Sequence, residues 1–280
     1  KTMKIYNLLR KIFIKFNVVN YLKNKQKLKN IKKSNTNQLN QFYKKVYSQN
    51  GEDGAIEKIF QDIGFESKIS VEIGAHWKEC NSRNLIEKYK FRGILIDASL
   101  PESINTKNKN ATFIRKWITK ENINQIINSE ISGEVDFLSI DVDGVDLHLV
   151  NEINVINPRV ICIEYCASLG KDISATVPYK PDYDRFKEHK SGFYCNASLL
   201  AYINLLKNKG YRFIGTIFGL NAFFVREDCK LQKLKELTCD EGFESHYDRT
   251  FIRGISQNDQ FNEIKDLNWI MIGKDGNFKY

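Results

Sequence analysis

The chain has 280 residues, 42% of them hydrophobic and 28% charged, which is enough for one large core and excludes a disordered or collagen-like protein. Its apolar stretches are interrupted by Lys or Asn well short of the ~18 residues that a membrane span needs, and we read no export signal in it. We therefore expect a soluble cytoplasmic protein. Its six cysteines contain no CxxC pair and are expected to be reduced thiols.

The net charge of +9 is concentrated near the N-terminus. Residues 1–50 contain 13 Lys or Arg and no acidic residue, whereas residues 51–280 contain 30 basic and 34 acidic residues. This distribution argues against nucleic acid as a partner. Residues 1–46 read as a basic helical arm with one apolar side. The arm is expected either to pack on the body or to lie on the inner face of the cytoplasmic membrane.

From residue 52 onward, short β-rich apolar runs alternate with helical segments. The expected helices include 53–63 and 197–209, each followed by a Gly that ends it. The expected strands are 69–73, 93–97, 112–114, 135–141, 159–164, 211–217 and 222–226. The first five are apolar on both faces and separated by crossover-length segments, so they predict a parallel sheet. The last two form a hairpin, which predicts a doubly wound, mostly parallel seven-stranded α/β sheet.

The sheet defines the predicted domain organisation. Residues 47–230 form the α/β domain, and residues 231–280 form a small C-terminal extension that ends in a strand at 269–272. The extension is acidic and aromatic. Exposed aromatic side chains in it would allow a homodimer.

Ligands of open α/β sheets bind outside the carboxyl ends of the strands. Gly74 and Ala75 follow the first expected strand, and Asn81 is placed to begin the next helix. Asp97 ends the second strand, 23 residues after Gly74, where a carboxylate accepts both hydroxyls of a ribose. The spacing favours a nucleoside-containing cofactor, and a dinucleotide is less favoured because no GxGxxG is present. The alternative is that Asp97 only caps the strand end.

Carboxylates gather at the next two strand ends. Asp141, Asp143 and Asp146 follow the fourth strand, and Glu164 ends the fifth. Neighbouring carboxylates repel one another unless a cation or a proton compensates. Three interpretations stay open: ligands of a divalent cation such as Mg²⁺, a general base for a substrate hydroxyl, or helix caps with salt bridges. His148, just after the cluster, is a further candidate base.

The segment 176–183, between the fifth strand and the next helix, is the expected lid over an acceptor. Its tyrosines, among them Tyr179, and its lysine, Lys180, suit a sugar phosphate or a nucleotide-sugar. The alternative is that Tyr179 only packs the loop onto the body.

Seven short segments share their pattern with one protein family. They are 47–54 (YSQNGEDG), 71–75 (VEIGA), 93–98 (GILIDA), 137–146 (FLSIDVDGVD), 163–165 (IEY), 196–199 (NASL) and 219–226 (GLNAFFVR). Together they resemble the FkbM-type S-adenosylmethionine-dependent methyltransferases, particularly those encoded with bacterial surface-polysaccharide genes. The resemblance covers roughly residues 42–230.

The resemblance implies a class I methyltransferase fold that binds S-adenosyl-L-methionine. Glu72, Gly74 and Ala75 would line the methionine end, Asp97 would bind the ribose, and the loop that carries Trp117 would border the adenine. The full set of implied cofactor-binding residues is Gln49, Glu72, Gly74, Ala75, Asn81, Asp97, Ala98, Trp117 and Asp141.

An alcohol acceptor must lose its proton as it is methylated, which calls for a base or a metal beside the methyl group. We expect Asp141, Asp143 and Glu164 to be that base or to bind Mg²⁺, with His148 as a further catalytic candidate. Tyr165, Tyr179, Tyr194 and Asn221 are expected to contact the acceptor. The expected function is O-methylation of a sugar, nucleotide-linked or glycan-linked, in capsule or lipopolysaccharide biosynthesis. The alternatives are a metal-dependent glycosyltransferase that uses Asp141 and Asp143, or a non-catalytic module that docks on a membrane.

Overall fold

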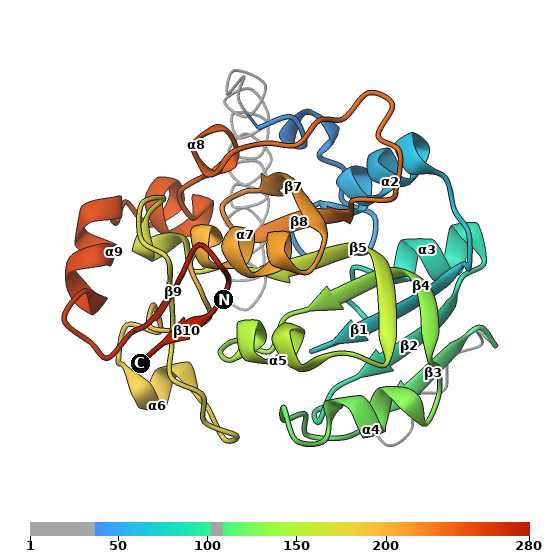
Figure 1. Cartoon of the computed structure of the whole chain (residues 1–280), viewed down its shortest axis with the longest axis horizontal. Helices are drawn as coiled ribbons and strands as arrows, with labels where there is room; N and C mark the ends of the chain where they lie inside the picture. Colours follow the sequence, from blue (N-terminus) through green and yellow to red (C-terminus); the bar gives the residue numbers. More distant parts are fainter. Residues whose placement is uncertain (1–36, 102–108) are drawn as a thin grey trace, which may run out of the picture. The chain divides into compact units, whose positions relative to one another are not determined.

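Seven strands form the central sheet of the computed structural model, which describes residues 37–101 and 109–280 (Figure 1). They are β1 (Ile69–Ile73), β2 (Arg92–Ile96), β3 (Ala111–Ile114), β4 (Gly133–Ile140), β5 (Ile156–Glu164), β7 (Tyr211–Ile217) and β8 (Asn221–Arg226). Their spatial order is β3-β2-β1-β4-β5-β8-β7, and of these β8 runs antiparallel to both of its neighbours. The predicted α/β class with a mostly parallel seven-stranded sheet is confirmed.

Helices cover both faces of the sheet, which explains why its strands are apolar on both sides. Helices α2 (Glu52–Ile63) and α3 (Arg83–Tyr89) lie on one face, and α4 (Ile123–Asn128), α5 (Asp146–Glu152) and α7 (Leu199–Asn208) lie on the other (Figure 1). Neighbouring residues of β4 serve the two faces in turn. Phe137 packs against Phe60 of α2, with ring centroids 6.4 Å apart, whereas Leu138 joins the core on the other face with Ile123 of α4.

Local signals set the helix ends. Helix α2 ends at Gly64 as predicted, where the backbone has φ +75°. Helix α7 begins at Leu199, two residues later than predicted, because the side chain of Ser198 accepts a hydrogen bond from the backbone N–H of Ala201 and caps the helix.

The strand register brings the predicted site residues to one edge of the sheet. Ile73 at the end of β1 pairs with Ile96 of β2 and Ile140 of β4. Glu164 at the end of β5 pairs with Asn221, the first residue of the antiparallel β8. The residues that follow β1, β2 and β4 therefore lie beside the end of β5.

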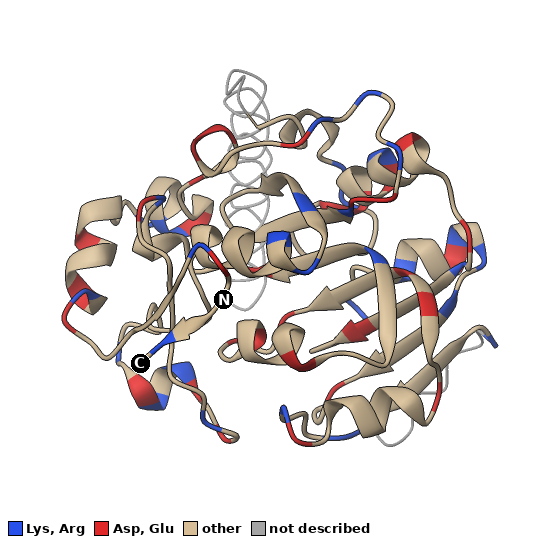
Figure 2. Cartoon of the chain, viewed as in Figure 1, with Lys and Arg blue, Asp and Glu red and all other residues tan. Residues whose placement is uncertain are grey.

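Most of the predicted basic arm lies outside the described residues, but its last part belongs to the body. Residues 37–42 pack along β7, where the Asn37 amide donates to the carbonyl oxygen of Thr216 at 2.7 Å and accepts from its N–H at 3.2 Å. The short helix η1 (Asn40–Phe42) follows. No described helix combines the length and the apolar character that a membrane crossing requires. Acidic and basic residues are interspersed over the described body (Figure 2).

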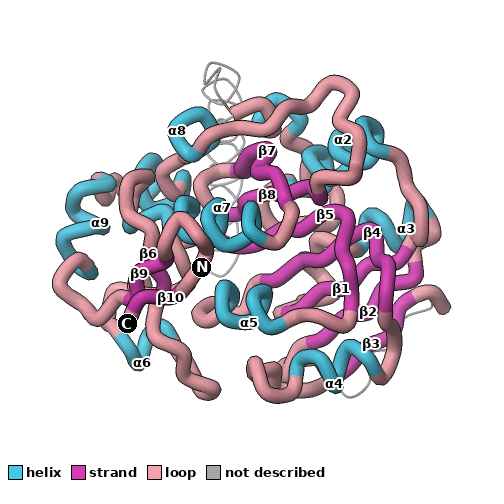
Figure 3. The backbone as a smooth tube through the Cα atoms, in the orientation of Figure 1, coloured by secondary structure: helices cyan, strands magenta, loops and turns pink. Residues whose placement is uncertain are grey.

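The C-terminal extension is joined to the loop after β5 through a second sheet (Figure 3). In this sheet β9 (Ile270–Ile272) pairs with β6 (Ala175–Thr176) and with β10 (Phe278–Lys279). The predicted strand at 269–272 corresponds to β9, whereas β6 and β10 span two residues each and were not predicted. The remaining short helices are η2 (Ala167–Leu169), α6 (Arg185–Glu188), α8 (Cys239–Gly242), η3 (Asp248–Ile252) and α9 (Gln257–Ile264). All six cysteines lie in the described ranges and are free of disulfides.

Candidate functional site

A cavity of about 350 Å³ opens at the carboxyl ends of β1, β2 and β4. Its volume lies at the lower end of the range of small-molecule sites, about 300–1,000 Å³. It is lined by Gly74, Ala75, His76, Ile96, Asp97, Ala98, Ser99, Lys116, Trp117, Ile118, Asp141, Val142, Asp143, Val145, Pro181 and Tyr183. Seven of these residues are among the predicted site residues: Gly74, Ala75, Asp97, Ala98, Trp117, Asp141 and Asp143.

Gly74 is required by the packing of two strand ends. Its φ is +82°, and a Cβ built on it would lie 1.6 Å from the carbonyl oxygen of Asp141. The close approach that this glycine permits is between the ends of β1 and β4. The glycine thereby brings Asp141 against the cavity floor.

Asp97 presents part of its carboxylate to the cavity. Its Oδ1 accepts hydrogen bonds from the N–H of Ser99 at 2.6 Å and from the Ser99 hydroxyl at 2.5 Å. No described residue donates to Oδ2, so one carboxylate oxygen remains for a ligand hydroxyl.

Asp141, Asp143 and Glu164 form a carboxylate cluster in which the ligand atoms lie within 4.8 Å of one another. Asn196 holds Glu164 in place through an Nδ2–H bond to Oε2 at 2.6 Å. Arg185, from α6, donates from Nη1 to Oδ1 of Asp143 at 2.6 Å and so places a positive charge beside the cluster. Asp143 itself has φ +61°, an unusual backbone conformation for an aspartate.

Burial and neighbouring negative charges raise the pKa of two of these acids, Asp141 and Glu164. Burial, with the neighbouring charges of Glu164 and Asp146, raises the pKa of Asp141 well above its usual range. Burial, with the charge of Asp143, also raises the pKa of Glu164. A carboxylate whose pKa is raised is a stronger proton acceptor, which suits it to act as a general base near neutral pH.

Asp146 stands apart from the cluster in its hydrogen bonds. Its carboxylate accepts from the N–H of Val142 at 3.0 Å and from the N–H of Gly144 at 3.1 Å, so it shapes the turn between β4 and α5. Burial and the charge of Glu164 raise its pKa to about 7 in spite of these bonds. Asp146 therefore stabilises the turn before α5 but does not cap that helix, whose N-terminus has no side-chain cap, whereas the other three acids face one another.

Three predicted cofactor residues do not line the cavity. Glu72 is buried and accepts from the N–H groups of Asn81 at 3.0 Å and Ser82 at 2.6 Å, which builds the turn before α3. Asn81 donates its side-chain amide to the Ser139 hydroxyl at 3.1 Å. Gln49 is exposed and its side chain contacts Asn50. These residues support the chain behind the cavity wall.

His148 and two predicted acceptor residues are engaged in packing. His148 is buried, its Nε2 lies 2.8 Å from the carbonyl oxygen of Val177, and burial lowers its pKa. Tyr165 is buried and donates its hydroxyl to the Glu244 carbonyl at 2.8 Å. The hydroxyl of Tyr194 donates to the carbonyl of Asn268.

The two remaining predicted acceptor residues are also hydrogen-bonded within the protein. Asn221 donates to Oε1 of Glu52 at 2.9 Å and is buried. Tyr179 donates its hydroxyl to Oε2 of Glu121 at 2.6 Å, which ties the predicted lid to the segment after β3. For Tyr179 the structure thus has contacts that pack the loop onto the body, as in the alternative to acceptor binding.

The predicted lid segment does border the cavity. Pro181 and Tyr183 line it, and Pro181 accepts a hydrogen bond from the indole N–H of Trp117 at 2.6 Å. The ring of Tyr183 lies against Gly144, where a Cβ would come within 2.4 Å of it.

Arg185 was not predicted from the sequence. The only local signal there is Asp184, which caps α6 by accepting from the N–H groups of Phe186 and Lys187.

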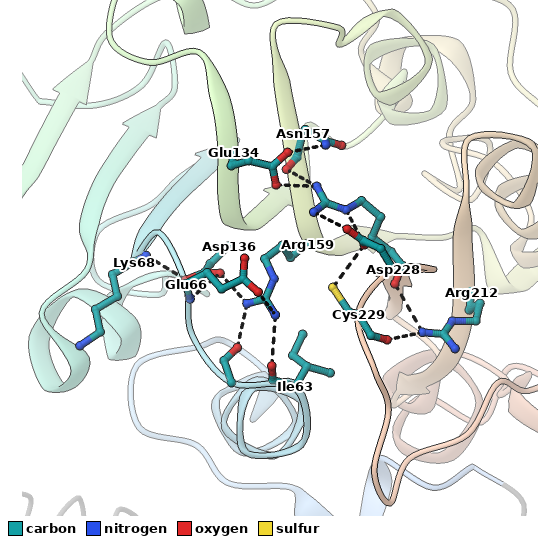
Figure 4. Close-up of polar contacts among 12 residues, drawn as sticks. Ile63, Glu66, Lys68, Glu134, Asp136, Asn157, Arg159, Arg212, Asp228 and Cys229 are labelled. Atoms are coloured by element: carbon teal, nitrogen blue, oxygen red, sulfur yellow. Dashed lines mark hydrogen bonds and ion pairs between the residues drawn. The ribbon is translucent and has the colours of Figure 1, made fainter.

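A second group of charged residues lies at the opposite ends of β4 and β5 (Figure 4). There Arg159 donates to Asp136 at 2.9 Å and to the carbonyl oxygens of Ile63 and Gly64. Asp136 also accepts from backbone N–H groups, including that of Lys68 at 2.8 Å. Because these groups satisfy one another, we assign the network to stability and the cavity to function.

No protein-family model and no curated protein matches this chain. The family indicated by the sequence pattern therefore stays a prediction, and the functional argument rests on the cavity and its carboxylates.

Proposed function

We propose that the protein is an S-adenosylmethionine-dependent methyltransferase that methylates a hydroxyl group of a sugar. The observation that carries the proposal is the cavity at the ends of β1, β2 and β4, which has Asp97 on its wall and Asp141 and Asp143 beside Glu164. The strand order, with one antiparallel strand next to β5, supports it because the resemblance implies such a sheet. The sugar and its origin in surface-glycan assembly follow from the resemblance alone.

The residues of the cavity fit the cofactor. Oδ2 of Asp97 is free to accept from a ribose hydroxyl, and Trp117, 58% exposed, offers an indole face for the adenine. Gly74 and Ala75 would border the methionine end. When bound, the cofactor supplies a methyl group that its sulfonium has already activated.

The chain's own part in the reaction is to align the acceptor and to take its proton. A carboxylate of Asp141 or Glu164 would accept the hydroxyl proton as the acceptor oxygen forms its bond to the methyl carbon. The raised pKa values of both groups support this role. Tyr183 and Pro181 would limit the access of water from the lid side.

The same cluster fits Mg²⁺ as an alternative. The three carboxylates offer oxygen atoms within 4.8 Å of one another, which is a hard donor set of the kind that binds Mg²⁺. A bound ion there would lower the pKa of the acceptor hydroxyl. Arg185 would have to release Asp143 to free that ligand.

Calorimetric titration with S-adenosylhomocysteine, with and without Mg²⁺, tests the proposal. We expect micromolar binding to the wild-type protein, and a loss of about tenfold or more for Asp97→Asn, which keeps the shape but weakens the acceptor. Asp228→Asn is the matched control, because Asp228 pairs with Arg226 away from the cavity. Absence of S-adenosylhomocysteine binding by a folded wild-type protein refutes the proposal.

The same titration separates the glycosyltransferase alternative. UDP- and GDP-sugars with Mg²⁺ or Mn²⁺ are the competing ligands, since Asp141 and Asp143 suit a metal-bound pyrophosphate as well. Metal-dependent binding of a nucleotide-sugar without any response to S-adenosylhomocysteine would favour glycosyl transfer. Absence of binding of both S-adenosylhomocysteine and the nucleotide-sugars would favour a non-catalytic docking module.

A further inference from the structure

Arg249 of η3 is a nearly buried cation that has no carboxylate partner among the described residues. Its exposure is 8%, its Nη1 donates to the hydroxyl of Ser168 at 3.0 Å, and its guanidinium lies 4.7 Å from the ring centre of Phe193. A charge removed from water is costly unless an opposite charge compensates it. The contacts of Arg249 with Ser168 and Phe193 are neutral, so neither supplies the opposite charge.

The free donors of Arg249 still reach solvent. Its Nε and Nη2 make no hydrogen bond in the described part of the chain. They are also not among the fully enclosed polar atoms that lack a hydrogen-bond partner. The same holds for Nε2 of His246, whose Nδ1 accepts from the Arg249 N–H at 3.3 Å. Two adjacent guanidinium donors match the geometry of a carboxylate or phosphate.

Arg249 packs against the two chain segments that carry and hold Glu164. Ser168 follows β5 only four residues after Glu164, and Phe193 precedes Asn196, which holds the Glu164 carboxylate at 2.6 Å. Arg249 thus contacts both segments that flank the Glu164–Asn196 hydrogen bond. In agreement, Arg249 and Arg185 both act to lower the pKa of Glu164, which burial and Asp143 raise.

The other cations of this region are already paired. Arg253 donates from Nε to Asp248 at 2.7 Å, and Arg185 is bound to Asp143. The positive charges of these arginines still act on His246. Burial, followed by the charges of Arg249, Arg253 and Arg185, lowers the pKa of His246 to about 3. With His246 neutral, Arg249 is a positive charge at this place that no described carboxylate pairs directly, although its charge acts on Glu164.

The order of strands separates this place from the cofactor. Asp97 follows β2, and Glu164 ends β5 at the same edge of the sheet. Arg249 lies on the far side of β5 from β2, since η3 begins beside the β7–β8 turn, where the N–H of Tyr247 donates to the Phe218 carbonyl at 2.9 Å. A ligand at Arg249 and a nucleoside at Asp97 would therefore meet at the carboxylate cluster.

We propose that Arg249 binds the anionic group, phosphate ester or carboxylate, of a sugar acceptor whose hydroxyl reaches Glu164. The proposal rests on the proposed function and names the substrate class of the same site. The C-terminal extension, which carries Arg249, is then part of the acceptor site rather than an appendage. Neutral sugars should be poor ligands.

Calorimetric titration of the full chain, in the presence of S-adenosylhomocysteine, with glucose 1-phosphate, glucuronate and glucose tests this. We expect at least one anionic sugar to bind about tenfold or more tightly than glucose, and Arg249→Gln to abolish that difference. The stronger of the two anionic sugars identifies phosphate or carboxylate as the preferred group. Arg253→Gln, at the residue that follows η3 and with its charge already paired to Asp248, should bind like the wild type.

Several outcomes would overturn the proposal: equal binding of glucose, no binding of either anionic sugar, or equal effects of Arg249→Gln and Arg253→Gln. Should Arg249→Gln fail to fold, modification of wild-type Arg249 by phenylglyoxal, followed by mass spectrometry, replaces it. Glucose 1-phosphate or glucuronate should then protect Arg249 and glucose should not, and lack of protection contradicts the proposal. Anionic sugar binding is measured separately from S-adenosylhomocysteine binding, so failure of the methyltransferase assignment is distinguishable from failure of this subsite.

Discussion

Asp136 and Arg159 form an ion pair that is almost fully enclosed, with side-chain exposures of 0% and 4% (Figure 4). Asp136→Asn would leave Arg159 with a neutral partner and weaken the bonds that Asp136 accepts from the N–H groups of Glu66 and Lys68. We expect a loss of about 3 kcal/mol in the free energy of unfolding, measured in urea. Asp228→Asn removes an exposed carboxylate and leaves Arg226 paired with Glu134, so it should cost about 1 kcal/mol or less. Equal small losses would contradict the structural role of Asp136.

Glu57 makes stability depend on acid pH. Burial alone would raise its pKa, but hydrogen bonds from Lys88, Asn84 and Lys44 outweigh burial and lower the pKa from 4.5 to about 2. Because the folded pKa lies below the unfolded one, the stabilisation is complete above pH 4.5 and is lost as the pH falls toward 2. Glu57→Gln should therefore be clearly destabilised in urea at about pH 7 and close to the wild type at about pH 2. A difference that is constant with pH would refute the assignment.

At the scale of the elements, β7 is an edge strand whose outer side is covered by residues 37–42. Asn37 acts as a substitute for a neighbouring strand, because it both donates to and accepts from the backbone of Thr216. Asn37→Ala should cost about 1–3 kcal/mol, since it leaves a buried N–H unpaired. Amide hydrogen exchange should show faster exchange at Thr216. Gln41→Ala, at an exposed position, is the control, and equal exchange rates in the two variants would contradict this role.

The sheet could be predicted from sequence because its signals are local. The strand Ile69–Ile73 was predicted at both ends, since an apolar run lies between polar segments and Gly74 follows it. The strands β6 and β10 could not be predicted, because strands of two residues exist only through their pairing with β9. Strand β6 lies far from β9 in the sequence, and β10 joins β9 in a short hairpin. Element type therefore follows from local pattern, and short strands follow from tertiary contacts.

The same distinction holds for the site. Asp97, Asp141 and Glu164 were expected at one edge because parallel strands bring their carboxyl ends together, and the register has that arrangement. Arg185 and Arg249 come from segments without hydrophobic periodicity, and their positions depend on how these segments pack. Sequence therefore pointed to the carboxylates, and the structure was needed for the arginines beside them.

At the scale of the whole molecule, the last residues of the chain hold the lid. Ile270 and Ile272 of β9 are buried, and Ile270 pairs with Thr176 at the start of the segment that carries Pro181, Tyr183 and Arg185. The last strand, β10, adds a stacking contact between Phe278 and His148, with ring centroids 5.2 Å apart. The extension and the cavity wall are therefore mechanically linked.

Removal of residues 269–280 should loosen the lid without unfolding the central sheet. Arg185 and Lys187 of α6 come directly after the lid, so limited trypsinolysis at these two residues reports its opening, and we expect cleavage there to become about tenfold faster or more. Ile272 is the buried member of the core cluster that is removed, and the other buried members lie outside residues 269–280, so far-ultraviolet circular dichroism should change little. Removal of Tyr280 alone, which is 97% exposed, is the matched control and should leave cleavage unchanged. Equal cleavage of the two truncated proteins would mean that the lid is held by its contacts with Trp117 and Asp143 and not by the second sheet.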